Sequence, residues 1–155
     1  MKKLMILTTI LMALGISTAC ADNDKPIAVT QLPQKAQLFI KTHFPKEKVA
    51  LAKLERDFLE TRYEVVFTNG SKVEFLKDGE WKEVECKYST VPTAIIPAQI
   101  ASYVSQNYPD TQIVQIDRDK RDYEVKLTNR LELTFDLNFN LIDIDAVSYT
   151  HLRAH

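Results

Sequence analysis

The chain has 155 residues, 45% of them hydrophobic, with 20 basic and 21 acidic side chains and a formal net charge of −1. This near-neutral balance argues against a nucleic-acid-binding protein, because such proteins need a basic surface. The chain contains only three glycines, which excludes a glycine-rich phosphate-binding loop.

Residues 1–21 have the order of a secretory signal peptide. The basic start MKK precedes the uncharged apolar run LMILTTILMALGI and then STACAD. Because this run is shorter than the ~20 residues that span a bilayer, we expect no transmembrane segment in the mature chain. Ala19-Cys20-Ala21 favours cleavage before Asp22 and a periplasmic protein. Lipid anchoring at Cys20 is the alternative, but Ser17 stands where lipoprotein signals usually carry a large aliphatic residue.

Removal of that segment changes the charge and the cysteine content. Without Lys2 and Lys3, 18 basic residues face 21 acidic ones, a net charge of −3. No polybasic run remains that could hold an anionic membrane. Cys86 becomes the one cysteine, and we expect it to pack as a small apolar group, with intermolecular pairing as the alternative. No CxxC motif or paired histidines provide a zinc site.

Two stretches of matching spacing predict helices. LPQKAQLFIKTHFP (32–45) and IPAQIASYVSQNYP (96–109) share their prolines and an apolar stripe at helical spacing. Pro33 and Pro97 suit a first helical turn, where a missing N–H costs nothing. Pro45 and Pro109 predict where each helix stops, since the residue before a proline avoids the helical region.

After each helix the apolar period changes to two, which predicts strands. YEVVFTNG (63–70) and YEVKLTNR (123–130) are nearly the same strand and turn, and we expect four strands in each half of the chain. Asn69-Gly70 is a strong hairpin signal. In the second half Arg130 replaces Gly70 and Phe139 replaces Gly79. Either those turns change type, or Asn129 and Asn138 take the left-handed positions.

These patterns predict an α+β fold made of two tandem repeats, residues 27–88 and 89–145. Each repeat would be one helix followed by a four-stranded antiparallel sheet, with the helices on one face. The two copies would either share a core or run their sheets together. The alternation ends at Asp145, and residues 146–155, AVSYTHLRAH, resemble translated sequencing-adapter read-through. We therefore expect this tail to be non-native and to add nothing to the fold.

The motifs LP…A..FI…FP, YEV.F.NG.K.EF, GEW..V.C and VP..IIP..I..YV..NYP resemble the secreted PepSY-like family, which is also called β-lactamase-inhibitor-like. The resemblance covers about Ile27 to Asp145. It implies a small exported protein of a Gram-negative envelope, built from tandem helix-plus-four-strand repeats. It also implies relatives that include an inhibitor that binds a secreted hydrolase across a concave sheet. The family supplies no catalytic residues.

The sequence predicts neither a catalytic site, nor a cofactor, nor a metal site. His43 ends the first helix without an evident nucleophile beside it, and we interpret it as a surface histidine near the helix C-terminus. The carboxylates of DRDKRD (117–122) are interleaved with cations and lack the glycine of a calcium loop, so we interpret this stretch as a solvated hairpin tip.

The predicted partner-binding surface is the helix-free face of the first sheet. Alternation places Tyr63, Val65 and Phe67 toward the helix, so their neighbours face away. The expected patch has Trp81 as its aromatic anchor, Val66 and Leu76 beside it, and Glu64, Glu74, Glu83 and Lys72 as a charged rim. The alternative is that Trp81 packs between the two repeats.

We therefore expect a non-enzymatic exported binding module that contacts a protein or peptide through an open sheet face, inhibitor-like by resemblance. A structural or stress-related envelope protein without a stable partner is the alternative. A hydrolase or metal enzyme is the least favoured reading.

Overall fold

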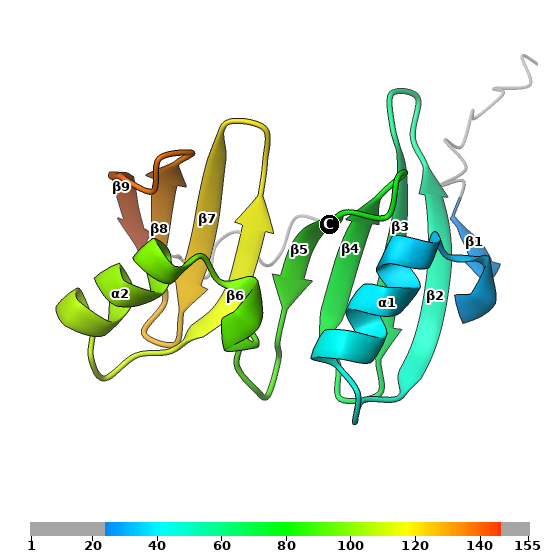
Figure 1. Cartoon of the computed structure of the whole chain (residues 1–155), viewed down its shortest axis with the longest axis horizontal. Coiled ribbons are helices and arrows are strands. Elements are labelled where there is room, and N and C mark those ends of the chain that lie inside the picture. The colour runs from blue at the N-terminus through cyan, green and yellow to red at the C-terminus, as the bar shows by residue number, and fades with distance from the viewer. Residues whose placement is uncertain (1–23, 147–155) are drawn as a thin grey trace, which may run out of the picture.

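The computed structural model describes residues 24–146, and within them nine strands form one antiparallel sheet in chain order. The strands are β1 (Lys25–Ile27), β2 (Val49–Arg56), β3 (Thr61–Phe67), β4 (Lys72–Leu76), β5 (Trp81–Glu85), β6 (Ile113–Arg118), β7 (Asp122–Leu127), β8 (Leu131–Asp136) and β9 (Leu141–Ala146). The helices α1 (Gln34–His43) and α2 (Ala98–Asn107) lie on the same face of the sheet (Figure 1). The signal peptide and the tail beyond Ala146 lie outside the described residues.

Prolines mark where both helices begin and end, as the sequence predicts. Pro33 and Pro97 are the residues that precede α1 and α2, and each helix has ten residues. Phe44 and Tyr108 end them, with backbone N–H groups donating to Ile40 and Val104. A short 3-10 helix precedes each one, at Val29–Gln31 and Thr93–Ile95.

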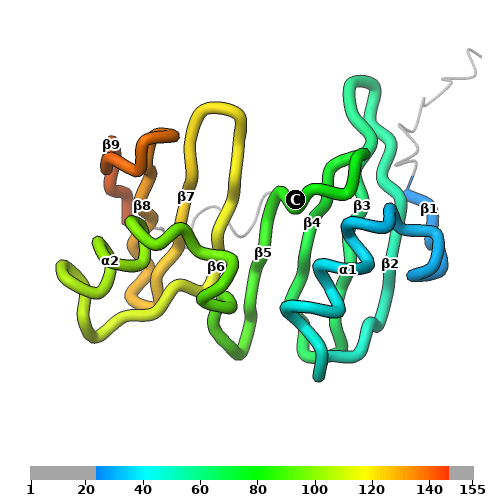
Figure 2. The backbone as a smooth tube through the Cα atoms, viewed as in Figure 1, coloured from blue at the N-terminus to red at the C-terminus, as the bar shows by residue number. Residues whose placement is uncertain are grey.

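The prediction of two tandem repeats, each with its own four-stranded sheet, is wrong. The tube in Figure 2 runs through one continuous sheet, because β5 pairs with β6 through Glu83–Asp117, Val84–Ile116 and Glu85–Gln115. The strand β1 adds a further antiparallel pair with β2. An unpaired strand edge exposes backbone donors and acceptors, and pairing β5 with β6 satisfies two such edges. The described chain is thus one strand-rich unit with two helices, and a boundary near residue 88 stays a prediction.

One apolar core lies between the sheet and the two helices. Ala36 and Ile40 of α1, and Ile100 and Val104 of α2, are buried in the same cluster as the inward-facing strand residues. Phe75 and Phe135 are among the completely buried side chains, and each forms a T-shaped contact with an aromatic ring from a helix, Phe39 and Tyr103 respectively. Cys86 is buried in this core, as expected of a small apolar group.

The turns of the second half keep the geometry of the first half without its glycines. Gly70 and Gly79 have φ of 81° and 86°, and Arg130 and Phe139 have φ of 69° and 63° at the matching positions. The expectation that these turns change type or use Asn129 and Asn138 is therefore wrong. Left-handed backbone costs a non-glycine residue about 1 kcal/mol, and Phe139 compensates by packing against the core.

Candidate functional site

The face of the sheet opposite α1 and α2 carries no described helix, and we call it the open face. Side chains on it alternate with the buried residues Val65, Phe67, Val73 and Phe75. Of the residues that the sequence places on this face, six are on it: Glu64, Val66, Lys72, Glu74, Leu76 and Glu83. They are half-buried, because long neighbouring side chains cover one another.

Five carboxylates cross the open face in direct register. We call them the carboxylate row, and they are Glu64, Glu74, Glu83, Asp117 and Glu124. Each is the direct cross-strand partner of the next, on the five consecutive strands β3 to β7. Side chains directly opposite one another have Cβ atoms ~5 Å apart, so like charges in this arrangement repel. Asp117 and Glu124 were not among the site residues predicted from the sequence, because local patterns do not tell which strand of the second half pairs with β5.

Burial and repulsion from neighbouring carboxylates raise the pKa of three carboxyls in this row. Burial raises the pKa of the Glu83 carboxyl, and the carboxylates of Glu74 and Asp117 raise it further. Burial likewise raises the pKa of Glu74, with a further contribution from Glu55. The pKa of Glu124 is raised by burial and then by Glu132. The fold therefore disfavours the charged form of three carboxyls in one line.

Cations stand beside the row without neutralising all of it. Lys53 lies 3.4 Å from Glu64 at one end, and Lys82 lies 3.0 Å from Asp117. Glu83 accepts a hydrogen bond from the amide of Gln115, which is neutral. Arg62 is 3.9 Å from Glu74 but forms its closer contacts with Glu60. The row thus keeps a negative surplus at its centre.

Trp81 does not lie on the open face, and this part of the sequence prediction is wrong. A β-bulge at Lys82 separates the pairs Glu74–Glu83 and Phe75–Trp81, which turns Trp81 to the helix side. Its ring centroid lies 6.3 Å from that of Phe39 in α1. The guanidinium of Arg118 stacks 4.5 Å from the ring centroid and donates to the Trp81 carbonyl. The alternative expectation was that Trp81 packs between the two repeats, and its contacts with Phe39 of the first half and Arg118 of the second half fit that alternative better.

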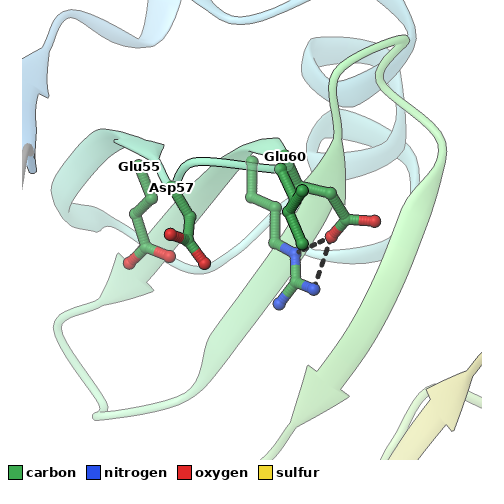
Figure 3. A pocket seen from close by; sticks show the side chains of 5 residues that line it. Glu55, Asp57 and Glu60 are labelled. Atoms are coloured by element: carbon green, nitrogen blue, oxygen red, sulfur yellow. Dashed lines mark hydrogen bonds and ion pairs between the residues drawn. The ribbon is translucent and has the colours of Figure 1, made fainter.

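A recess lies at the end of the β2–β3 hairpin, next to the open face. It has a volume of about 490 Å³ and is lined by Glu55, Asp57, Leu59, Glu60 and Arg62. Figure 3 shows the three labelled carboxylates around it, with a guanidinium bonded to Glu60. Arg62 bonds Glu60 and Lys53 lies 2.6 Å from Glu55, so three carboxylates face two cations here. No functional residue was predicted in this hairpin, and the signal that could have indicated one is the apolar pair Phe58-Leu59 between charged residues.

The remaining candidates do not form a reactive group. The His43 ring packs on Phe39 at the end of α1, with centroids 4.6 Å apart. Burial raises the pKa of the Cys86 thiol, which disfavours the reactive thiolate. Within residues 24–146 no three His, Cys, Asp or Glu side chains are grouped so that they could hold a metal ion. No helix in that same range is long and apolar enough to cross a membrane.

Comparison with known proteins identifies the family. Residues 61–143 match the family described as "Putative beta-lactamase-inhibitor-like, PepSY-like". The chain belongs to this family. The PepSY-like resemblance expected from the sequence is therefore confirmed. No curated protein matches the chain.

Solved structures of Bacteroides proteins are similar to this PepSY-like chain. A "putative calcium-regulated periplasmic protein" from Bacteroides thetaiotaomicron is 67% identical with a TM-score of 0.78, over 79% of this chain and 96% of that one. A "putative periplasmic protein" from Bacteroides vulgatus is 61% identical with a TM-score of 0.78, over 81% and 98%. A second B. vulgatus periplasmic protein "of unknown function" is 36% identical with a TM-score of 0.76, over 79% and 98%. The protein is exported and periplasmic, as the signal peptide predicts.

Proposed function

We propose that this periplasmic protein is a non-enzymatic binding module that contacts a protein partner through the open face of its sheet. The observation that carries the proposal is the carboxylate row, five directly paired acidic side chains on a face that no described helix covers. The inhibitor-like description of the family supports a protein as the partner.

The row is unfavourable for the fold, which supports a role outside it. Directly opposed like charges destabilise a sheet by up to about 1 kcal/mol per pair. The pair Glu74–Glu83 sits at its centre, and the pKa of each of these carboxyls is raised. Alternating cations and anions would stabilise the same strands better. Proteins retain locally unfavourable residues most often at functional sites, where the cost is compensated elsewhere.

The charge of the face defines the chemistry of the partner. A line of carboxylates across five strands complements Lys and Arg side chains that approach from outside. Such complementarity speeds encounter and selects against acidic partners. Val66 and Leu76 flank the row and add apolar contact area. We therefore infer a protein with a cationic surface or an extended cationic segment.

We assign no metal role to this chain, although one relative is described as calcium-regulated. Calcium takes six to eight oxygen ligands from a compact set of residues. The row instead supplies one carboxylate per strand, and no grouping within residues 24–146 could hold a metal ion.

A structural envelope protein without a stable partner is the second candidate. The one observation in its favour is that most open-face cations already have partners within the fold, such as Lys72 with Glu85 at 3.0 Å. A saturated charge network would need no external ligand. The two candidates differ in whether another protein touches this face in the periplasm.

Site-specific photo-crosslinking in the intact periplasm tests the proposal. Benzoylphenylalanine at Lys72, a 38% exposed side chain on the open face, should crosslink to a distinct protein. The same probe at Ser102, which is exposed on α2, is the matched control and should not. The protein so identified, once purified, should bind the full chain less tightly as salt increases. Crosslinking that is absent at both positions, or equal at both, would favour the structural candidate.

A further inference from the structure

Two large apolar side chains are exposed to solvent at the tip of the β2–β3 hairpin. Phe58 is 98% exposed and Leu59 is 84% exposed. Single exposed apolar residues are common on soluble proteins. Two exposed apolar residues in succession at a hairpin tip are uncommon, because such positions favour Gly, Asn, Asp and Ser. Within residues 24–146 these are the two most exposed of the large hydrophobic side chains.

Hydrogen bonds within the hairpin hold its tip in a defined conformation. The Asp57 N–H donates to the Glu60 carbonyl at 2.9 Å and closes the hairpin around Phe58 and Leu59. The Asp57 carboxylate accepts a hydrogen bond from the Phe58 N–H at 2.6 Å. Below the tip, β2 and β3 pair without interruption from Arg56–Thr61 to Leu51–Val66. Figure 1 shows this hairpin projecting beyond the neighbouring β4–β5 turn.

Acidic groups surround the apolar tip on its open-face side. Glu55, Asp57 and Glu60 line the recess below Leu59, where Arg62 bonds Glu60 and Lys53 lies 2.6 Å from Glu55. Arg56 lies on the other side of the hairpin, since it alternates with Glu55. The same Arg62 lies 3.9 Å from Glu74, so this rim continues into the carboxylate row.

We propose that Phe58 and Leu59 form an insertion element that enters an apolar pocket with a cationic rim on the partner that the open face binds. This inference rests on the proposed function and adds where the apolar contact lies. Aromatic side chains that are buried in a partner pocket are frequent anchors at protein interfaces. The acidic rim of the tip then faces the cationic rim of the pocket.

The charge of the tip disfavours the other occupants. Anionic lipid headgroups attract basic segments, so a tip with Glu55, Asp57 and Glu60 along one side is poorly suited to a membrane. A second copy of this chain that packed tip to tip would bring six of these carboxylates together. A protein pocket with Lys or Arg at its edge has neither problem.

The test places benzoylphenylalanine at Phe58 in the full chain in the periplasm. Asn138, an exposed residue in the β8–β9 turn, carries the probe in the control. The probe at Phe58 should crosslink to the protein that is also reached from Lys72. The crosslinked peptide should lie in a pocket with apolar walls and Lys or Arg at its edge. Crosslinks to lipid, to a second copy of this chain, or equal to those from Asn138 would overturn the insertion element.

Binding of the purified partner supplies the second readout. Phe58→Ala/Leu59→Ala should weaken the affinity at least about tenfold, since anchor residues dominate interface energetics. Both side chains are exposed, so the melting temperature should not change. Asn138→Ala should bind like the wild type. Unchanged affinity of the double variant would also overturn the proposal.

The two proposals fail in different ways. Crosslinking from Lys72 without crosslinking from Phe58 would remove the insertion element and keep the open face as the binding surface. Crosslinking from Phe58 alone would keep an insertion tip and remove the open face. The absence of specific crosslinks from both positions would remove both proposals.

Discussion

Neutralising the centre of the carboxylate row should stabilise the protein. Glu83 faces Glu74 on one side and Asp117 on the other, in direct register with both. Glu83→Gln removes one charge from both pairs and keeps an oxygen that can accept the hydrogen bond from Gln115. Each directly opposed like-charge pair costs ~0.2–1 kcal/mol. Because Lys82 and Lys72 screen part of this repulsion, we expect a gain of about 0.5–1 kcal/mol.

That gain corresponds to a rise of about 2–5 °C in melting temperature for a domain of this size. Thermal unfolding followed by circular dichroism at pH 7.5 measures it. Glu80→Gln is the matched control, because Glu80 pairs with Lys35 and Arg118 and the pKa of its carboxyl is lowered. This control should not raise the melting temperature. If Glu83→Gln lowers the melting temperature as much as Glu80→Gln does, the row is not unfavourable for the fold and the argument fails.

The same reasoning gives a direction for the pH dependence. The pKa of Glu83 and of Glu74 is higher in the folded protein than the ordinary value of 4.5. The folded state therefore binds protons more readily, so stability should rise as pH falls from 7.5 toward about 5. The advantage of Glu83→Gln over the wild type should shrink over the same range. The lowered pKa of Glu80 acts in the opposite direction, and only as pH approaches and falls below 4.5. A wild-type melting temperature that falls from pH 7.5 to 5 would contradict this assignment.

Further expectations concern turns and the partly buried indole of Trp81. Gly79→Ala should cost about 1–3 kcal/mol, because its φ is 86° and an added Cβ would lie 2.8 Å from the Pro33 Cβ. Gly70→Ala should cost less, since its added Cβ meets only the flexible Lys87 side chain; equal losses in urea unfolding would argue against the contact with α1. Trp81→Ala should destabilise by about 2–3 kcal/mol and Phe75→Ala by about 3–5 kcal/mol. A Trp81→Ala variant as stable as the wild type would contradict the packed position of the indole.

Local sequence patterns predicted the helices and several strands well. Pro33 and Pro97 mark where α1 and α2 begin, and the period of two in residues 63–67 matches β3. These features depend on residues near one another in the chain, where steric rules and alternation act directly.

Features that depend on non-local pairing were missed. The union of all strands in one sheet follows from the pairing of β5 with β6, whose residues lie about thirty apart in sequence. The orientation of Trp81 depends on one extra residue, Lys82, at a β-bulge, which reverses the alternation beyond it. The carboxylate row needs the pairing of β5 with β6, because Asp117 joins Glu83 only through that register. Arg130 and Phe139 adopt left-handed backbone that local propensity disfavours.

The affinity of the crosslinked partner for a row variant tests the central claim most directly. The variant Glu74→Gln/Glu83→Gln/Glu124→Gln removes three charges from the carboxylate row and leaves the helix face unchanged. Calorimetric titration of the partner should show at least about tenfold weaker binding, while thermal unfolding shows the variant to be more stable than the wild type. Unchanged affinity in a correctly folded variant would contradict the account, because the row would then serve neither the fold nor the partner.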